Sequence, residues 1–282
     1  MRPSPSADGN DEPVSWGTTA RARRHWDRVR DAQLAPATEL MLDLAGVGTG
    51  SRVLVVAAGA GAEALAAARR VGPSGWVLAT DVAPAMVREA TEAAREAGHA
   101  NLRAQVMDAE RLDLAPASFD AVISRLGLMF FPHLGRALRG IRRVLVPGGK
   151  LAAIVYSSPE RNPIFSLLAP IVWRHTHTRP RPLTGLTVLR LGRPGLLEAA
   201  YRRAGFYDPR VQAVPIVLRL PSAADCLQLV QETVVPITEL LAGATQDERE
   251  ATWTEVGQLL RQFEGPTGFA LPGEVLVGTG TK

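Results

Sequence analysis

A buried strand that runs directly into a turn of small residues constrains this chain more than any other feature. Val53 to Val56 is a continuous apolar run without a polar face, which is typical of a strand buried on both sides of a parallel sheet. Residues 57–62 (AAGAGA) predict a turn without a large side chain, and residues 64–70 (ALAAARR) predict a helix. This order is typical of the first βα unit of a nucleotide-binding fold, where backbone N–H groups approach a ligand closely.

The glycines of this turn fit two classes of ligand. Gly59-x-Gly61-x-x-Ala64 also matches the dinucleotide fingerprint G-x-G-x-x-G/A. Asp81 ends the next apolar run and suits a ribose hydroxyl acceptor for either class. A nicotinamide oxidoreductase therefore stays open as an alternative, although the chain has no Tyr-x-x-x-Lys pair.

The alternation of strands and helices continues along the chain. Further strands are expected at residues 76–80, 102–107, 119–124 and 150–156, and helices at 84–97 and 134–145. Five strands that alternate with helices predict an α/β fold with a Rossmann-like, doubly wound parallel sheet. A sixth strand is expected at 211–220 and a short final strand at 274–278.

Changes in composition divide the chain into five parts. Residues 1–14 are rich in Pro, Ser, Asp and Gly and are expected to be a disordered tail. Residues 15–48 predict a helical arm that Pro36 divides into two helices, and Trp26 in this arm either meets a ligand or docks the arm on the core. The other parts are a core at 49–156, a proline-rich cap at 157–195 over the carboxyl ends of the strands, and a C-terminal part at 196–282 that completes the sheet and carries a helical insertion.

The bulk composition favours a cytoplasmic protein that acts on small molecules. Arginine supplies 30 of the 32 basic residues and is dispersed along the chain, so a nucleic-acid partner is not expected. The single cysteine, Cys226, allows no internal disulfide and suits a core position. No membrane span, secretory signal or metal site is expected, and a homodimer is left open.

Five segments, in order and at the usual spacing, resemble the class I S-adenosylmethionine-dependent methyltransferases. The segments are RVLVVAAGAG, VGPSGWVLATDVAPAM, NLRAQVMDAERL, SFDAVISRLGLMFFP and RRVLVPGGKL. The chain is especially similar to the branch of ubiquinone/menaquinone-biosynthesis methyltransferases, over about residues 16–207. The resemblance implies S-adenosyl-L-methionine as the cofactor. It also implies a seven-stranded sheet whose last strand is antiparallel, with 211–220 and 274–278 as the final two strands.

The resemblance implies a cofactor site at the carboxyl ends of the strands. Asp81 is placed to bind the ribose, Val82 and Met86 to flank the adenine, and Asp108 to accept from the adenine amino group, with the Ala109 N–H nearby. Asp108 also fits a helix or turn cap. The remaining expected cofactor contacts are Ala57, Gly59, Gly61, Ser124 and Arg125, the last of them facing the methionine carboxylate.

One position departs from the family pattern. Val55 stands where the family usually has an acidic residue that helps to hold the methionine end of the cofactor, and Ala57 replaces the usual first glycine. Glu63 is close in sequence but lies at the start of a helix, so whether it compensates is open. Val55 therefore motivates an alternative, a methyltransferase-fold protein that binds a ligand or catalyses a reaction other than methylation.

The preferred hypothesis is methyl transfer to a small, hydrophobic or natural-product-like acceptor. A base is needed only if the acceptor must lose a proton. The candidates are His133, which comes after the fourth predicted strand, and Tyr156, which ends the fifth. His25, His175 and His177, in the arm and cap, are weaker candidates for the same role.

Overall fold

Parallel strands alternate with helices through the first half of the molecule. The computed structural model describes residues 20–176, 187–234, 237, 241 and 243–282. The expected tail at 1–14, the first residues of the arm and His177 lie outside this range. The alternating elements are β1 (Arg52–Val56), α2 (Ala62–Val71), β2 (Trp76–Asp81), α3 (Pro84–Glu96), β3 (Leu102–Val106), β4 (Phe119–Arg125), α4 (Leu134–Val144) and β5 (Leu145–Tyr156).

The sheet has the predicted doubly wound architecture, with an antiparallel strand near one edge. Its order is β3-β2-β1-β4-β5-β8-β6, where β6 is Tyr207–Leu220 and β8 is Gly268–Thr281. β1 pairs in parallel with both β2 and β4, whereas β8 runs antiparallel to β5 and β6. A two-residue strand, β7 (Glu264–Gly265), pairs with β8 off this path.

The prediction of a short final strand at 274–278 is wrong, because β8 spans 14 residues. Pro272 and Gly273 break the sequence pattern, but both pair with β6 at Val217 and Ile216. The ladder between β5 and β8 begins only at Val275, so one side of the strand at Pro272 is not paired with β5. A proline is tolerated in such a position because no ladder partner needs its missing N–H.

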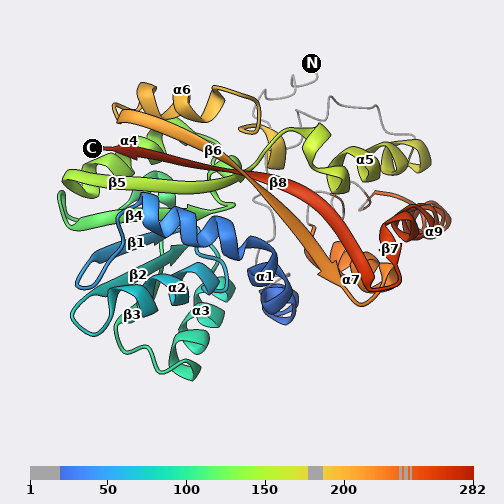
Figure 1. The fold of residues 1–282 in the computed structure, drawn as a ribbon, viewed down its shortest axis with the longest axis horizontal. Helices are drawn as coiled ribbons and strands as arrows, with labels where there is room; N and C mark the ends of the chain where they lie inside the picture. The colour runs from blue at the N-terminus through green and yellow to red at the C-terminus, as the bar shows by residue number, and fades with distance from the viewer. Residues whose placement is uncertain (1–19, 177–186, 235–236, 238–240, 242) are drawn as a thin grey trace, which may run out of the picture.

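Helices cover both faces of the sheet. On one face α1 (Ala20–Leu44) and α2 pack on Val53, Val55 and Ile123, together with Ala94 of α3. On the other face α4 and α6 (Leu196–Arg203) pack on alternate residues of the same strands, such as Leu54 and Val122. This alternation places the core in two apolar layers and leaves the carboxyl ends of the strands at one edge (Figure 1).

A second group of helices lies along the far ends of β6 and β8 (Figure 1). It consists of α5 (Pro163–His175), α7 (Ala223–Thr233) and α9 (Gln246–Leu260). These helices pack on Leu218 and Phe269 of the two long strands. Short 3₁₀ helices connect the larger elements at η2 (Ala109–Arg111), η3 (Leu128–Phe130), η4 (Pro159–Arg161), η6 (Thr187–Leu189) and η7 (Arg261–Phe263).

The prediction that Pro36 divides the arm into two helices is wrong, since α1 is continuous through it. Pro36 is exposed, whereas Leu34, Ala37 and Met41 are buried against the sheet. This burial offsets the hydrogen bond that a proline removes from a helix interior. Sequence pattern alone does not report that compensation.

Trp26 docks α1 on the C-terminal helices. The Trp26 side chain is buried among residues of α5 and α7, and its indole N–H donates to Glu232 at 2.7 Å. Arg24 pairs with Glu89 and Glu96 of α3. α1 therefore connects α3 with the C-terminal helices, and the burial of Trp26 supports the docking alternative.

Candidate functional site

The turn after β1 has the conformation of a ligand-binding loop. Ala57, Gly59 and Gly61 all have positive φ angles, of 56°, 54° and 97°. A Cβ on Gly61 would lie 3.0 Å from the Cβ of Ala90 on α3, so the glycine allows this close approach. The Gly59 N–H donates to Asp81 Oδ2 at 2.9 Å, which ties the turn to the end of β2.

Replacing Ala57 by glycine should raise the free energy of unfolding by about 0.5–1 kcal/mol. A side chain in the left-handed region costs roughly 1–2 kcal/mol, which exceeds the entropy that glycine adds to the unfolded chain. Urea denaturation would measure the change. Ala58→Gly is the matched control, because Ala58 is buried and has no positive φ, and it should lower stability. A destabilised Ala57→Gly protein would show that the methyl group packs more favourably than its backbone strain costs.

Asp81 lies at the turn with both carboxylate oxygens engaged. Oδ2 accepts from Gly59 and Oδ1 accepts from the Ala83 N–H at 3.0 Å. A carboxylate offers about four lone-pair sites, so both oxygens retain capacity for ribose hydroxyls. Val82, next in the chain, is 57% exposed at this edge, whereas Met86 is 2% exposed and packs with Ala83. Val82 is therefore accessible to a ring, and the contact expected for Met86 stays a prediction.

Asp108 begins the short helix η2, as the capping alternative expects. Its Oδ1 accepts from the Glu110 N–H at 2.9 Å, and Ala109 is buried in the first position of the helix. The Met107 N–H donates to the Asp81 carbonyl at 2.9 Å, so the ends of β2 and β3 are held together. Asp108 is exposed, and a cap that uses one oxygen leaves the other accessible from this edge.

Ser124 presents an unpaired hydroxyl beneath the turn. The residue is fully buried near the end of β4, and its Oγ has no hydrogen-bond partner among the described residues. A Cβ on Gly127 would lie 2.7 Å from both this Oγ and the Ala57 Cβ. This close packing explains why a glycine stands at position 127. A buried hydroxyl without a partner is costly, so the unpaired Ser124 Oγ fits a polar ligand group bound near the turn.

Arg125 joins three elements at the same edge. Its Nη2 lies 2.9 Å from Asp31 Oδ1 of α1 and 3.2 Å from Glu63 Oε2 of α2. Nη1 lies 3.4 Å from Thr38 Oγ1. The sequence analysis left open whether Glu63 compensates for Val55, and it did not name Asp31. Asp31 lies in the arm, far from the turn in sequence, so no local signal could have identified it.

Burial raises the pKa of Glu63 to about 7, although the Arg125 charge acts in the opposite direction. Asp31 and Asp27 of α1 add further negative charge and also raise this pKa. A single guanidinium thus faces three carboxylates. The cluster carries an excess of negative potential beside the turn.

The two candidate bases occupy different surroundings. His133 is exposed, precedes α4, and donates its backbone N–H to Glu110 at 2.6 Å. Tyr156 ends β5 and packs edge-on against Phe165 with ring centroids 4.9 Å apart. Of the weaker candidates, His175 bonds Glu255 at 2.7 Å, and His25 is exposed beside Trp26. The structure brings Tyr156 into contact with the described residues of the cap.

The cap forms an apolar cluster around Tyr156. Phe165, Val188 and Leu189 are buried there, and Phe130 packs against them from the segment after β4. Asn162 anchors the start of α5, because its Nδ2 donates to the Glu274 carbonyl at 3.0 Å and its Oδ1 accepts from the Glu274 N–H at 3.2 Å. The carboxyl edge thus has a polar half at the turn and an apolar half at the cap.

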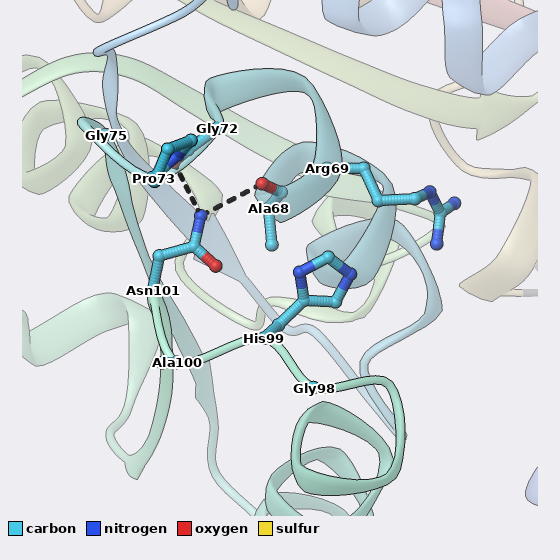
Figure 2. A pocket seen from close by; sticks show the side chains of 9 residues that line it. All are labelled: Ala68, Arg69, Gly72, Pro73, Gly75, Gly98, His99, Ala100 and Asn101. Atoms are coloured by element: carbon cyan, nitrogen blue, oxygen red, sulfur yellow. Dashed lines mark hydrogen bonds between the residues drawn. The ribbon is translucent and has the colours of Figure 1, made fainter.

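A hollow at the opposite edge of the sheet belongs to neither half. Figure 2 shows it between the turn that precedes β2 and the residues that precede β3. Asn101 Nδ2 donates to the carbonyls of Ala68 and Gly72, at 3.0 and 2.9 Å, and these bonds tie the two segments together.

Within the described residues, no group of three or more His, Cys, Asp or Glu side chains could hold a metal ion, and no helix is long and apolar enough to span a bilayer.

Comparisons with known proteins agree with this arrangement. A family model described as a methyltransferase domain matches residues 53–149. The chain is 35% identical over 146 residues to the aklanonic acid methyltransferase DauC of Streptomyces sp. strain C5, covering 51% of this chain and 65% of that protein. It is 36% identical over 119 residues to the ubiquinone/menaquinone biosynthesis C-methyltransferase UbiE of Pseudomonas entomophila, covering 42% of this chain and 46% of that protein.

A longer match and a solved structure extend the comparison. The nocamycin O-methyltransferase of Saccharothrix syringae is 30% identical over 199 residues, which cover 67% of this chain and 70% of that protein. The fold resembles the crystal structure of YcgJ from Bacillus subtilis with a TM-score of 0.58 and 19% identity, over 88% of this chain and 98% of that chain. The matched segments span between about half and two thirds of the length of DauC and UbiE.

The sheet order, the glycine turn and the polar groups at the carboxyl edge define a Rossmann-like ligand-binding fold. With the relatives above, they show that the chain belongs to the class I S-adenosylmethionine-dependent methyltransferase family, as its sequence segments indicate.

Proposed function

We propose that this protein transfers a methyl group from S-adenosyl-L-methionine to a small, hydrophobic acceptor. The observation that carries the proposal is the polar half of the carboxyl edge, where Asp81 holds the glycine turn and Ser124 Oγ is without a partner among the described residues. When bound, the cofactor supplies a methyl group that its sulfonium already activates. The chain's part is to hold the cofactor, orient the acceptor and exclude water.

The proposed residue roles are those that the sequence analysis expects. Asp81 accepts from the ribose hydroxyls, Val82 and Met86 flank the adenine, and Asp108 and Ala109 contact its edge. The turn residues Ala57, Gly59 and Gly61 approach the cofactor through their backbone, with Ser124 and Arg125 at its methionine end. The apolar cluster around Phe165 supports a hydrophobic, ring-containing acceptor, because apolar side chains beside a binding edge favour contact with apolar surface.

Calorimetric titration with S-adenosylmethionine, S-adenosylhomocysteine and NAD tests the proposal. Binding of the first two and no binding of NAD is the expected result. Transfer of a labelled methyl group to a panel of aromatic hydroxyl compounds would then identify the acceptor class. Tight binding of NAD alone would overturn the proposal in favour of the nicotinamide alternative.

Asp81→Ala should weaken S-adenosylmethionine binding by about 1.5–3 kcal/mol, the range for hydrogen bonds to a charged group. The variant loses the proposed ribose acceptor and the bond that holds Gly59. Calorimetry measures the change, with thermal unfolding recorded in parallel. Asp113→Ala is the control, because Asp113 is exposed in the loop after η2. Equal affinities for Asp81→Ala and wild type would show that other groups hold the ribose.

The role of a base is proposed for Tyr156 ahead of His133. Tyr156 lies in the apolar cluster of the cap, whereas His133 is exposed at the start of α4. Tyr156→Phe keeps the ring that packs on Phe165 and removes only the hydroxyl.

A cytoplasmic location and a homodimer stay predictions. Size-exclusion chromatography with light scattering tests the homodimer.

One observation favours a second candidate function. Val55 is fully buried in the apolar core of β1, so the acid usual in the family is absent. A methyltransferase-fold protein that binds its ligand without methyl transfer would tolerate this loss. Cofactor binding without turnover of any acceptor, at millimolar cofactor, would favour this candidate.

A further inference from the structure

The methionine end of the cofactor needs charged partners that β1 does not supply. This end carries an α-ammonium and an α-carboxylate group, and burying either without a counter-charge is costly. Val55 pairs with Ile123 of β4, and both pack in the core beneath α1 and α2. Arg125 lies two residues beyond Ile123 on the same strand, so its side chain is directed to the same face. Arg125 and the carboxylates that it contacts therefore lie on the face of the sheet that Val55 also faces.

Glu63 is the buried carboxylate of this group. It lies in the first turn of α2, directly after the glycine turn, and is 3% exposed. Glu63 and Asp81 are the only buried carboxylates among the described residues, and Asp81 accepts from the turn and from Ala83. Glu63 contacts Arg125 at 3.2 Å, and a carboxylate has about four lone-pair sites, so it can also accept from a cationic group near the turn. The N-terminus of α2 adds a favourable field for its charged form.

The cluster has one cation, Arg125, against the three carboxylates of Glu63, Asp31 and Asp27. On α1, Asp27 and Asp31 face Glu63, and on β4 Arg125 is the cation that faces it. Asp31 is 44% exposed at its side chain, whereas Glu63 is 4% exposed. Water can stabilise Asp31, but it cannot reach Glu63. Because Glu63 is buried, water does not stabilise its charged form. An ammonium group beside Glu63 would stabilise it instead.

We propose that Glu63 binds the α-ammonium group at the methionine end of the cofactor, with Arg125 receiving its α-carboxylate. The proposal rests on the proposed use of S-adenosylmethionine and deepens it. Glu63 thereby takes the place of the acid absent at Val55. It is a positioning residue for the cofactor and takes no part in the transfer of the methyl group.

Two adenosine ligands separate this role from a structural one. S-adenosylhomocysteine carries the amino-acid end, whereas 5′-methylthioadenosine has the same adenosine and sulfur without it. Glu63→Gln should lower the affinity for S-adenosylhomocysteine by roughly tenfold or more, which is the scale of a lost charge-assisted hydrogen bond. The affinity of the variant for 5′-methylthioadenosine should stay within about twofold of the wild-type value. The control is Glu250→Gln on α9, where Glu250 is exposed. It should change neither affinity.

The wild type provides a second test that needs no variant. Binding of an ammonium beside Glu63 should release a proton from it, so affinity for S-adenosylhomocysteine should rise with pH from about 6 to 7.5. Calorimetry in buffers of different ionisation enthalpy would detect this proton, and 5′-methylthioadenosine should release none. Equal losses for both ligands in Glu63→Gln, or no loss for either, would overturn the proposal. Failure of the wild type to bind S-adenosylhomocysteine would instead overturn the proposed function, and this inference with it.

Discussion

Replacing Gly192 by alanine should lower the free energy of unfolding by about 3 kcal/mol, the upper end of the usual cost of overpacking. A Cβ at Gly192 would lie 2.2 Å from the Ser157 carbonyl oxygen, 2.5 Å from the Ser157 carbonyl carbon and 2.7 Å from the Tyr156 carbonyl oxygen. All three are backbone atoms, so no side-chain rotation relieves the contact. The segment after η6 or the end of β5 must move.

The movement should also reach the proposed acceptor site. Tyr156 packs on Phe165, and Val188 and Leu189 of η6 belong to the same cluster. Denaturant unfolding measures the loss of stability. Gly48→Ala is the matched control, because Gly48 has no positive φ and a Cβ there meets nothing within 4 Å. Similar stabilities for the two variants would contradict the close contact between the cap and β5.

Glu63 should make the protein less stable as the pH rises from about 4.5 to about 7. Burial raises its pKa from an ordinary 4.5 to about 7 in the folded protein. Between these values the folded protein keeps the proton and the unfolded chain loses it, so the free energy of unfolding falls with pH. Below about pH 4.5 Glu63 is neutral in both the folded and the unfolded protein, so it does not change the free energy of unfolding with pH. Above about pH 7 it is charged in both, and the decrease in the free energy of unfolding is complete. The full change corresponds to about 3 kcal/mol.

Glu63→Gln should remove this pH dependence. Thermal or urea unfolding of the ligand-free protein at several pH values, with the wild type beside it, measures the difference between the two proteins. Titratable groups that are present in both proteins contribute equally to the two free energies of unfolding, so their contributions cancel in that difference. Glu250→Gln should retain the wild-type slope. A constant difference between wild type and Glu63→Gln from pH 4.5 to 7.5 would mean that Arg125 keeps Glu63 charged throughout.

Local pattern was sufficient for the parallel half of the fold. Val53 to Val56 has no polar face and precedes a turn without large side chains, so its burial and its place in a βα unit follow from the residues. The position of Asp81 at the carboxyl end of a strand also follows from the local pattern. Such strand ends are where ligands bind in open α/β sheets, which made Asp81 a candidate site residue. Asp108 was less determined, since an acid after a strand serves equally as a cap.

Other features depended on contacts between distant segments. A proline breaks a helix when its neighbours are exposed, yet α1 continues through Pro36 because Leu34, Ala37 and Met41 pack on the sheet. The length of β8 was missed for a similar reason. Its pairing with β6 across Pro272 is a tertiary contact that no local pattern records.

The sequence by itself determined the family and the alternation of strands and helices in the parallel half, because both follow from residues adjacent in the chain. Only the tertiary structure decided the charges at the carboxyl edge of the sheet. Asp31, Glu63 and Arg125 are far apart in sequence and meet because α1 and α2 pack on the same face of the sheet. Burial by that packing changes the protonation of Glu63, and burial depends on every segment that surrounds a residue.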